Sequence, residues 1–278
     1  MNYEIVDKII PIDEKRKCKI KLINDHFENA KKYITSKAQL IIADIPYNLG
    51  NNAYASNPSW YIGGDNRNGE SKLANSSFFD TDNDFKINNF FDFCSRYLIK
   101  EPKEKGKAPA MIIFCAFEQI PMVIELGKQH GFQNSYPLVF VKNYSSQVLK
   151  ANMKIVGATE YAIVLYRDKL PKFNNKDMNG NNRMIFNWFE WRRDNSKDYP
   201  KIHPTQKPVN LLKELIKIFT DEGDVVIDPV AGSGSTLRAC AELKRTCYGF
   251  EIKKDFCKNA KDKMLGNIKL QETIFDYE

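Results

Sequence analysis

The chain has 278 residues, and its 42% hydrophobic content is enough to bury one large core, or a core with a modest insertion. No run of eighteen apolar residues occurs and the N-terminal residues do not resemble a signal peptide, so we expect neither a membrane span nor a secretory leader. The formal net charge of +7 suits a polyanionic partner but does not identify one.

The six cysteines are not arranged for disulfide or metal chemistry. They form no C-x-x-C pair, and most lie in apolar or amphipathic segments. The three histidines, His26, His130 and His203, are not spaced with cysteines as a zinc-ligand set. We therefore expect reduced structural thiols, a cytoplasmic location and no metal.

The chain begins with a basic stretch and a strand. Apolar residues alternate from Cys18 to Ile23, which predicts the strand. Asn24-Asp25 then leads into a predicted helix with apolar residues at helical spacing from Phe27 to Ile34. Asp25 is a candidate N-cap for this helix.

The next strand ends in an acid, a proline and an aromatic residue. Leu40 to Ala43 is apolar throughout, as in parallel strands that are covered on both faces. Pro46 cannot donate a ladder hydrogen bond, so Asp44 and Tyr47 project from the carboxyl end of the strand, where open α/β sheets bind ligands. For this tetrapeptide alone, an ordinary Asp-Pro turn is an equally good interpretation.

Residues 48–89 are rich in Asn, Ser, Gly and Asp, and they are too numerous for an ordinary connection. Because the stretch directly follows Tyr47, we predict a mobile lid over a substrate. Apolar runs and amphipathic helices then alternate: helix 89–99, strand 110–116, helix 118–130, strand 137–141 and a strand within 157–166. This alternation predicts a doubly wound, mostly parallel α/β sheet.

Positive charge is concentrated between Lys142 and Lys201. This stretch has twelve Lys and Arg against six Asp and Glu, so it carries six of the seven net charges. Scattered lysines usually mark a solvated surface, but the concentration favours a nucleic-acid face. The candidate DNA contacts are Lys142, Arg192 and Arg193.

A polar block, His203-Pro204-Thr205-Gln206-Lys207-Pro208, precedes a helix with an apolar face from Leu211 to Phe219. We predict that the helix begins within the block and that Thr205 caps it. The positive end of the helix then suits a carboxylate, although a capped helix with no further role is the alternative.

Further on, the chain predicts strand, glycine turn, helix and strand. Val225 to Asp228 is apolar up to its acid, the turn contains Gly232 and Gly234, and Glu251 lies near the end of the following strand. Glycines let a backbone approach a ligand, and an acid in this place commonly binds ribose hydroxyls. A nicotinamide oxidoreductase is disfavoured because Leu237 occupies the position of its third glycine.

Three motifs in this order resemble the β class of S-adenosylmethionine-dependent DNA amino-methyltransferases. Such enzymes carry D-P-P-Y or D-I-P-Y, then H-P-T-Q-K-P, then D-P-F-x-G-S-G-T; here the first is Asp44-Ile45-Pro46-Tyr47 and the last begins at Asp228-Pro229. The resemblance runs from about residue 25 to about residue 264. Ile45 replaces a proline and Val230 an aromatic residue. The stretch 157–160 also resembles a His-x-x-Glu segment of the class, with Gly and Ala at its first positions.

The resemblance implies roles for individual residues. Asp44 and the Ile45 carbonyl would accept hydrogen bonds from the target amine, Pro46 would stiffen the turn and Tyr47 would stack on the base. The implied cofactor-binding residues are Asp25, His203, Pro204, Thr205, Gln206, Lys207, Asp228, Pro229, Ala231, Gly232, Ser233, Gly234, Ser235, Thr236 and Glu251. The implied division is a catalytic half (1–141), a target-recognition region (142–201) and a cofactor-binding half (202–278).

The implied reaction is methylation of adenine N6 in a specific DNA sequence, by base flipping in a duplex or on single-stranded DNA. Serine at the first tetrapeptide position is more often associated with cytosine-N4 enzymes, so Asp44 favours adenine. Cytosine N4, RNA or a protein amide as the acceptor, and a non-catalytic DNA-binding protein on the same fold, are the alternatives. A homodimer is left open, and no membrane partner is expected.

Overall fold

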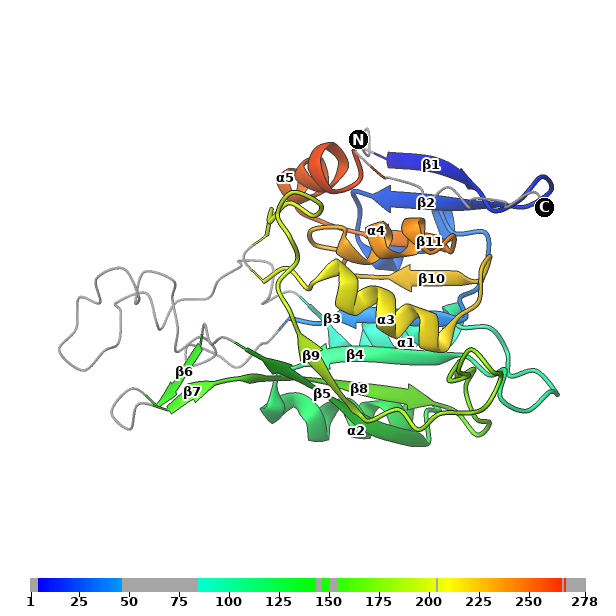
Figure 1. The fold of residues 1–278 in the computed structure, drawn as a ribbon, viewed down its shortest axis with the longest axis vertical. Helices are drawn as coiled ribbons and strands as arrows, with labels where there is room; N and C mark the ends of the chain where they lie inside the picture. Colours follow the sequence, from blue (N-terminus) through cyan, green and yellow to red (C-terminus); the bar gives the residue numbers. More distant parts are fainter. Residues whose placement is uncertain are drawn as a thin grey trace.

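A central β-sheet organises the protein. The computed structural model describes residues 5–46, 85–143, 147–150, 155–203, 205–266 and 268. Among these residues the main sheet has nine strands (Figure 1). Their order across the sheet is β1 (Ile5–Pro11), β2 (Lys17–Ile23), β11 (Thr246–Phe250), β10 (Val225–Asp228), β3 (Leu40–Asp44), β4 (Ala110–Cys115), β8 (Thr159–Tyr166), β5 (Asn134–Lys142) and β9 (Trp188–Trp191).

The middle of the sheet is parallel. Strands β2, β11, β10, β3 and β4 run in one direction, whereas β8 is antiparallel to both of its neighbours and β1 is antiparallel to β2. At the other edge, β9 is parallel to β5. All six residues of β4 and the first four of β3 are buried, as expected for strands covered on both faces. The predicted mostly parallel α/β sheet is confirmed.

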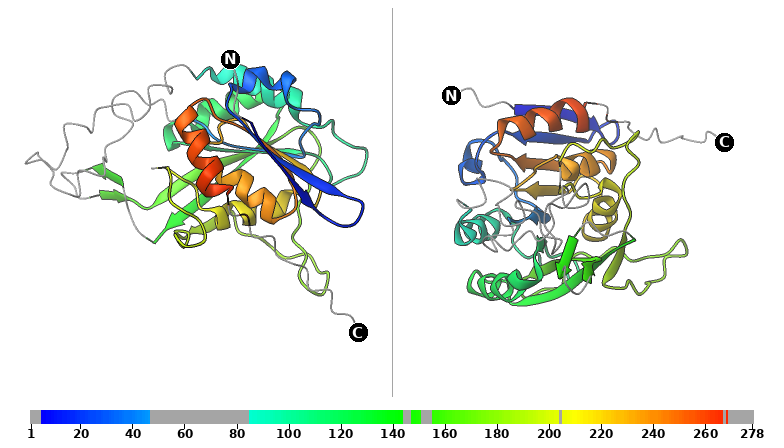
Figure 2. Two further views of the ribbon diagram at one scale, coloured as in Figure 1. Left: turned by 90° about the horizontal axis from the view of Figure 1, so that it is seen from above. Right: turned by 90° about the vertical axis from the view of Figure 1, so that its left-hand side faces the viewer.

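Helices cover both faces of the sheet (Figure 2). One layer contains α3 (Val209–Phe219), α4 (Ser235–Glu242) and α5 (Lys254–Asn259), which continues as a π-helical turn (Ala260–Met264). The other layer contains the 3-10 helix η1 (Phe27–Lys32), α1 (Ile87–Tyr97) and α2 (Ile120–Gln129), which follows the short 3-10 helix η5 (Phe117–Gln119). Each layer closes a separate hydrophobic cluster against the sheet.

Several elements differ from the sequence predictions. The strand β1 was not predicted, and the helix after Asp25 is a 3-10 helix whose N-cap is His26. Most of the predicted lid, up to residue 84, lies outside the described residues, and its last three residues form the first turn of α1. Among the described residues, no helix is both long enough and apolar enough to cross a bilayer.

The predicted recognition region, 142–201, contributes to the main sheet. Both β8 and β9 come from it, so the part that leaves the sheet is narrower than these boundaries. The antiparallel pair β6 (Gln147–Lys150) and β7 (Ile155–Gly157) extends beyond the sheet on the side where β3 and β10 end (Figure 1). The division of labour itself stays a prediction.

The two main motifs meet at one edge of the sheet. Strand β10 is hydrogen-bonded to β3 on one side and to β11 on the other, and all three are parallel. Their carboxyl ends therefore lie side by side. This arrangement brings Asp44, Asp228 and Glu251 to the same edge although they are far apart in the sequence.

Candidate functional site

The turn after β3 is held by hydrogen bonds from neighbouring elements. The Ile45 N–H donates to the Phe114 carbonyl of β4 at 3.2 Å, and Ile45 is only 1% exposed. The Gln119 side chain is also buried, and its Nε2 donates to the Pro46 carbonyl at 2.9 Å. These contacts fix the direction in which Asp44 leaves the strand. Gln119 carried no sequence signal, and Tyr47 lies outside the described residues.

Asp44 belongs to a compact cluster of four charged side chains. Its Oδ2 lies 2.6 Å from the Lys207 Nζ, which is also 3.5 Å from Oε2 of Glu160. The other oxygen of Glu160 pairs with Lys142. The charges alternate in sign and sum to zero, which permits their burial. The Trp191 ring lies against both ammonium groups, 4.9 Å from that of Lys142 and 5.6 Å from that of Lys207.

Two oxygens of this cluster lack a hydrogen bond. Asp44 Oδ1 and Glu160 Oε2 are buried and have no hydrogen-bond partner among the described residues. The Lys207 contact to Glu160, at 3.5 Å, is an ion pair without hydrogen-bond geometry. The Asp44 side chain as a whole is 28% exposed, so the carboxylate borders solvent while Oδ1 is shielded.

The cluster shifts the pKa of each carboxyl group. Burial raises the pKa of Asp44, and the attraction of Lys207 only partly opposes that rise. Burial also acts to raise the pKa of Glu160, but Lys207 and Lys142 together outweigh it and leave this pKa below its usual value. Burial acts to lower the pKa of Lys207, but the two carboxylates outweigh it and raise this pKa. Lys207 is therefore a cation shared between Asp44 and Glu160.

The glycine turn after β10 is open toward one side. Gly232 and Gly234 adopt φ values of +50° and +74°, a conformation that L side chains rarely adopt. Among the described residues, a Cβ at Gly232 would meet only His203 Nε2, at 4.0 Å, whereas one at Gly234 would press on Ala260 at 3.2 Å. Gly234 is thus packed against the π-helical turn, while Gly232 leaves room for another molecule.

Two buried carboxyl groups flank this turn. Glu251 Oε2 accepts the Gly232 N–H at 2.9 Å, and its Oε1 accepts the Lys253 N–H at 2.7 Å. Asp228 Oδ1 accepts the Val230 N–H at 3.1 Å, and the Thr236 side chain acts to lower the pKa of Asp228. Burial raises the pKa of Asp228 to about 7, and burial likewise raises the pKa of Glu251 to about 7. Neither group forms a salt bridge with another described residue.

The remaining residues of the motif lie in the turn and in the first turn of α4. Pro229 and Ala231 follow β10, and the Ala231 N–H donates to the Phe250 carbonyl at 2.8 Å, which ties the turn to β11. The hydroxyl groups of Ser233 and Ser235 are buried and lie 2.8 Å apart. The turn is therefore fixed by hydrogen bonds within itself and to the end of β11.

Asp25 accepts hydrogen bonds but does not cap a helix. Its carboxylate receives the His26 N–H at 2.8 Å, the Asn29 amide at 2.8 Å and the Tyr33 hydroxyl at 2.7 Å. Burial acts to raise the pKa of Asp25, but these hydrogen bonds outweigh it and lower the pKa. The N-cap interpretation was wrong. Asn24 Nδ2 donates to the Glu251 carbonyl at 2.8 Å, so this segment lies beside the end of β11.

The polar block does not begin the helix that follows it. Helix α3 starts at Val209, whose N–H donates to Asp194 Oδ2 at 2.6 Å, so the predicted cap by Thr205 was wrong. Thr205 instead contacts His203 Nδ1, with its hydroxyl at 3.2 Å. Because Asp194 supplies a carboxylate to the positive end of α3, that end is not available to an anionic ligand in this arrangement.

Other residues of the block are held in the loop. Gln206 folds back on it, accepting the Ile202 N–H at 3.0 Å and donating to the Pro200 carbonyl at 3.1 Å. Pro204 lies outside the described residues. Burial, with the positive charges of Lys207 and Lys253, lowers the pKa of His203 to about 4, so this imidazole is neutral at pH 7.

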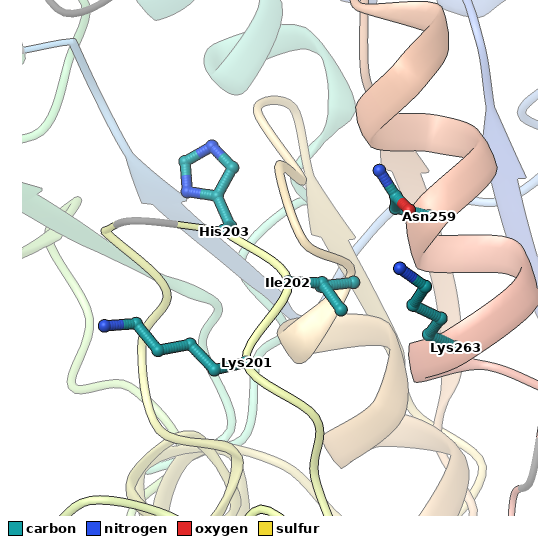
Figure 3. Close-up of a pocket in the computed structure, with 5 residues that line it drawn as sticks. All are labelled: Lys201, Ile202, His203, Asn259 and Lys263. Carbon is teal, nitrogen blue, oxygen red and sulfur yellow. The ribbon is translucent and has the colours of Figure 1, made fainter.

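A pocket of about 360 Å³ adjoins the glycine turn through His203. Figure 3 shows Asn259 and Lys263 on one helical segment, across from the loop that carries the other lining residues, Lys201, Ile202 and His203. Two lysines thus contribute positive charge to a pocket beside the turn. This charge suits an anionic group.

The candidate DNA contacts occupy two different environments. Arg192 and Arg193 are exposed just after β9, at the edge of the sheet that carries Asp44, and Arg192 pairs with Glu190 at 2.6 Å. The Lys142 side chain is only 9% exposed and belongs to the buried cluster. Its interpretation as a phosphate contact is corrected accordingly. Its partner Glu160 could have been singled out by the His-x-x-Glu resemblance.

Comparison with known proteins identifies the family. A model of the DNA methylase family of N6/N4 methyltransferases matches residues 38–262. The chain belongs to this family. It is a DNA methyltransferase, and the match includes the Asp44 turn, the polar block and the glycine turn.

Curated relatives agree with this family. The chain is 30% identical over 146 residues to the methylase YubD of Escherichia coli, which covers 52% of this chain and 57% of YubD. It is 26% identical over 269 residues to the DNA adenine methyltransferase YhdJ of the same bacterium, covering 84% and 78%. The type II methyltransferase M.HpaI of Haemophilus parainfluenzae is 24% identical over 81% of this chain and 67% of that protein. The matched region thus spans little more than half of YubD.

Solved structures share the fold. A complex of M1.HpyAVI with SAM superposes with a TM-score of 0.58 at 23% identity, over 82% of this chain and 89% of the other. The cytosine-N4-specific PvuII DNA methyltransferase gives a TM-score of 0.59 at 12% identity, over 86% and 84%. At these identities the likeness concerns the fold alone.

Proposed function

We propose that this DNA methyltransferase transfers a methyl group from S-adenosylmethionine to the N6 amine of adenine. The observation that supports an exocyclic amine as the acceptor is the state of Asp44, whose Oδ2 is held by Lys207 while its Oδ1 has no hydrogen-bond donor among the described residues. A buried acceptor without a partner is unfavourable by about 1–3 kcal/mol. An exocyclic amine supplies the missing N–H and gains an oriented carboxylate.

The residues around Asp44 fit the needs of an aromatic amine. The lone pair of such an amine is delocalised into the ring, and positive charge develops on the nitrogen as the new bond forms. The Asp44 carboxylate accepts an N–H and stabilises that charge, because its position is fixed before the reaction. The Ile45 carbonyl is proposed as a second acceptor and Tyr47 as the stacking surface for the base.

The residues of the glycine turn fit S-adenosylmethionine. Gly232 has open space where a side chain would stand, as far as the described residues show, and the nearby Asp228 and Glu251 carboxyl groups form no salt bridge with them. Glu251 is proposed to accept hydrogen bonds from the ribose hydroxyls, and the basic pocket beside His203 to receive the methionine carboxylate. When bound, the cofactor supplies a methyl group already activated by its sulfonium. Solved neighbours include complexes named for this cofactor.

A specific DNA sequence is the proposed substrate. The named relatives include type II methyltransferases, which suggests a role in restriction-modification. A stacked base cannot present its amine to the shielded Asp44 oxygen, so the target base must be flipped or single-stranded. Arg192 and Arg193, exposed at the same edge, are proposed to bind backbone phosphates. The six cysteines are free and buried, in keeping with the proposed cytoplasmic location.

Adenine is favoured over cytosine by two observations. The relative that aligns over 84% of this chain is named a DNA adenine methyltransferase, and the first residue of the tetrapeptide is an aspartate. Cytosine N4 is the second candidate, because the family includes both acceptors and a structural neighbour is cytosine-N4-specific. Both amines would meet the same Asp44 oxygen.

Nucleoside mass spectrometry separates these candidates. DNA of mixed sequence is incubated with the protein and S-adenosylmethionine carrying a deuterated methyl group, then digested to nucleosides. We expect labelled N6-methyl-2′-deoxyadenosine, and none with Asp44→Asn. Labelled N4-methyl-2′-deoxycytidine would identify cytosine as the acceptor instead of adenine. The absence of any labelled nucleoside, with cofactor binding intact, would contradict the proposal.

A further inference from the structure

We propose that Lys207, Glu160 and Lys142 form a buried positioning relay that holds one oxygen of Asp44 and leaves the other for the target amine. This inference rests on the proposed function, because it assigns Asp44 the role of amine acceptor. It adds positioning residues to that role. None of the three touches the reacting atoms; they act through Asp44.

The relay runs across the sheet from one element to the next. Lys207, from the loop before α3, lies between Asp44 of β3 and Glu160 of β8, and Lys142 of β5 closes the chain. The contact between Lys207 and Asp44 joins residues 163 positions apart. The Trp191 and Phe114 rings lie 5.6 Å and 5.2 Å from the Lys207 ammonium and exclude water from it. Lys207 is thereby kept on Asp44 rather than in solvent.

Lys207 alone would not produce this arrangement. A single ammonium facing a single carboxylate can move toward either oxygen, and its full charge would oppose the positive charge that develops on the amine. Glu160 draws Lys207 to the Oδ2 side of Asp44 and offsets part of its charge. Lys142 in turn neutralises Glu160. The relay therefore supplies orientation, and its single net positive charge is balanced by Asp44, so that the four side chains together are neutral.

Other titratable groups also face Asp44. Asp228 of β10 and Cys115 of β4 interact with it electrostatically, in addition to Lys207, Glu160 and Lys142. Of these groups, only the two relay lysines stabilise the Asp44 carboxylate by their charge. Removing Lys207 must therefore favour protonation of Asp44, and removing the charge of Glu160 must oppose it.

The test uses the opposite directions in which these two changes should shift the pKa of Asp44. The pH dependence of kcat for DNA methylation is measured for the wild type, Lys207→Met, Glu160→Gln and the double variant. We expect the acidic limb of Lys207→Met to move up by about one pH unit or more, since an opposite charge shifts a carboxyl pKa by 1–3 units. Its kcat at pH 7 should fall about 100-fold, with little change in KM for DNA. The Glu160→Gln limb should move down.

The double variant provides a check that is independent of fold damage. It restores neutrality, with Asp44 facing Lys142 only, so its acidic limb should lie between those of the single variants. Lys172→Met is the matched control. This lysine is equally buried and pairs with Asp221 at 2.7 Å and Asp224 at 2.5 Å, close to the start of β10. Its loss should lower stability and leave the pH profile unchanged.

A second readout needs neither cofactor nor DNA. The titration of the Asp44 carboxyl is followed by ¹³C NMR in the protein alone, with Asp44→Asn identifying the signal. The midpoint should rise in Lys207→Met and fall in Glu160→Gln. Shifts of both variants in the same direction, or no shift in either, would overturn the relay. If the two variants show these opposite shifts but the wild-type protein methylates no DNA, the relay would be retained and the proposed function refuted instead.

Discussion

The two halves of the site differ in whether their buried carboxylates form salt bridges. At the end of β3, Asp44 and Glu160 are matched by Lys207 and Lys142, so the protein supplies its own counter-charges. At the ends of β10 and β11, Asp228 and Glu251 have hydrogen bonds from the backbone but form no salt bridge within the described part of the chain.

This difference separates positioning from binding. A compensated carboxylate is held in one orientation, which suits an acceptor that must meet an amine in a fixed place. Uncompensated carboxyl groups are unfavourable in the free protein, and burial raises the pKa of each to about 7. They become favourable when a ligand brings hydroxyl and ammonium donors. The charges at the β3 end are therefore balanced before binding, whereas under the proposed function the carboxyl groups at the glycine-turn end gain their partners from the ligand.

The largest expected effect comes from breaking the compensated end. Asp44→Ala should reduce methyl transfer about 1,000-fold or more, because the amine loses its charged acceptor. Cofactor affinity should stay within about twofold, since Asp44 is not part of the glycine turn. Methyl incorporation and calorimetry on the same preparation measure both quantities. Near-normal turnover would exclude Asp44 as the amine acceptor.

Glu251→Ala tests the other end and should give the reverse pattern. The dissociation constant of S-adenosylmethionine should rise about 10- to 100-fold, the range expected for a lost hydrogen bond to a charged group. At saturating cofactor, kcat should recover most of its value. Glu251→Gln keeps one acceptor oxygen, so its dissociation constant for S-adenosylmethionine should lie between those of the wild type and Glu251→Ala. A variant that binds the cofactor normally would show that this carboxylate does not contact it.

The sequence predicted the residues at the ends of β3 and β10 better than the side-chain contacts that connect these parts of the site. The apolar run into Asp44, the glycine turn and the acid after β11 are local patterns, and the structure places each on the predicted element. The salt bridge between Lys207 and Asp44 depends on how distant loops pack, which local spacing cannot encode. The predicted cap of α3 failed because Asp194, earlier in the same connection between β9 and α3, folds back onto the Val209 N–H, and the local sequence does not show this fold. Tyr47 and most of the predicted lid lie outside the described residues.

Because Asp228 is buried without a salt bridge, we also predict that replacing it with a neutral residue stabilises the protein at high pH. Asp228 has a pKa of about 7 in the folded protein, above its ordinary value of 3.8, so the folded state holds its proton more tightly than the unfolded state does. This contribution is complete below about pH 4 and is lost as the pH rises through 7. Asp228→Asn should therefore raise the free energy of unfolding by about 4 kcal/mol at pH 8, with little gain at pH 4. Urea unfolding at both values measures it, and an equal gain at both would exclude ionisation as the cause.

A smaller effect is expected at the proposed DNA surface, which adjoins the compensated end. Replacing Arg192 and Arg193 with glutamine should lower DNA affinity about tenfold and reduce the salt slope by about two, one for each lost phosphate contact. Cofactor affinity should not change. The control is the Lys15→Gln, Arg16→Gln variant, which removes two exposed charges from the β1–β2 turn. Equal losses in both variants would indicate a general charge effect.

The central claim is that Asp44 binds the exocyclic amine. A double-mutant cycle, with one change in the protein and one in the target base, tests it most directly. Target oligonucleotides carrying adenine, or purine without the amine, are titrated with the wild type and with Asp44→Ala in the presence of S-adenosylhomocysteine. The wild type should prefer adenine about tenfold, a typical value for a hydrogen bond to a charged group, and the variant should bind both oligonucleotides equally. Retention of the full preference by Asp44→Ala would contradict the account.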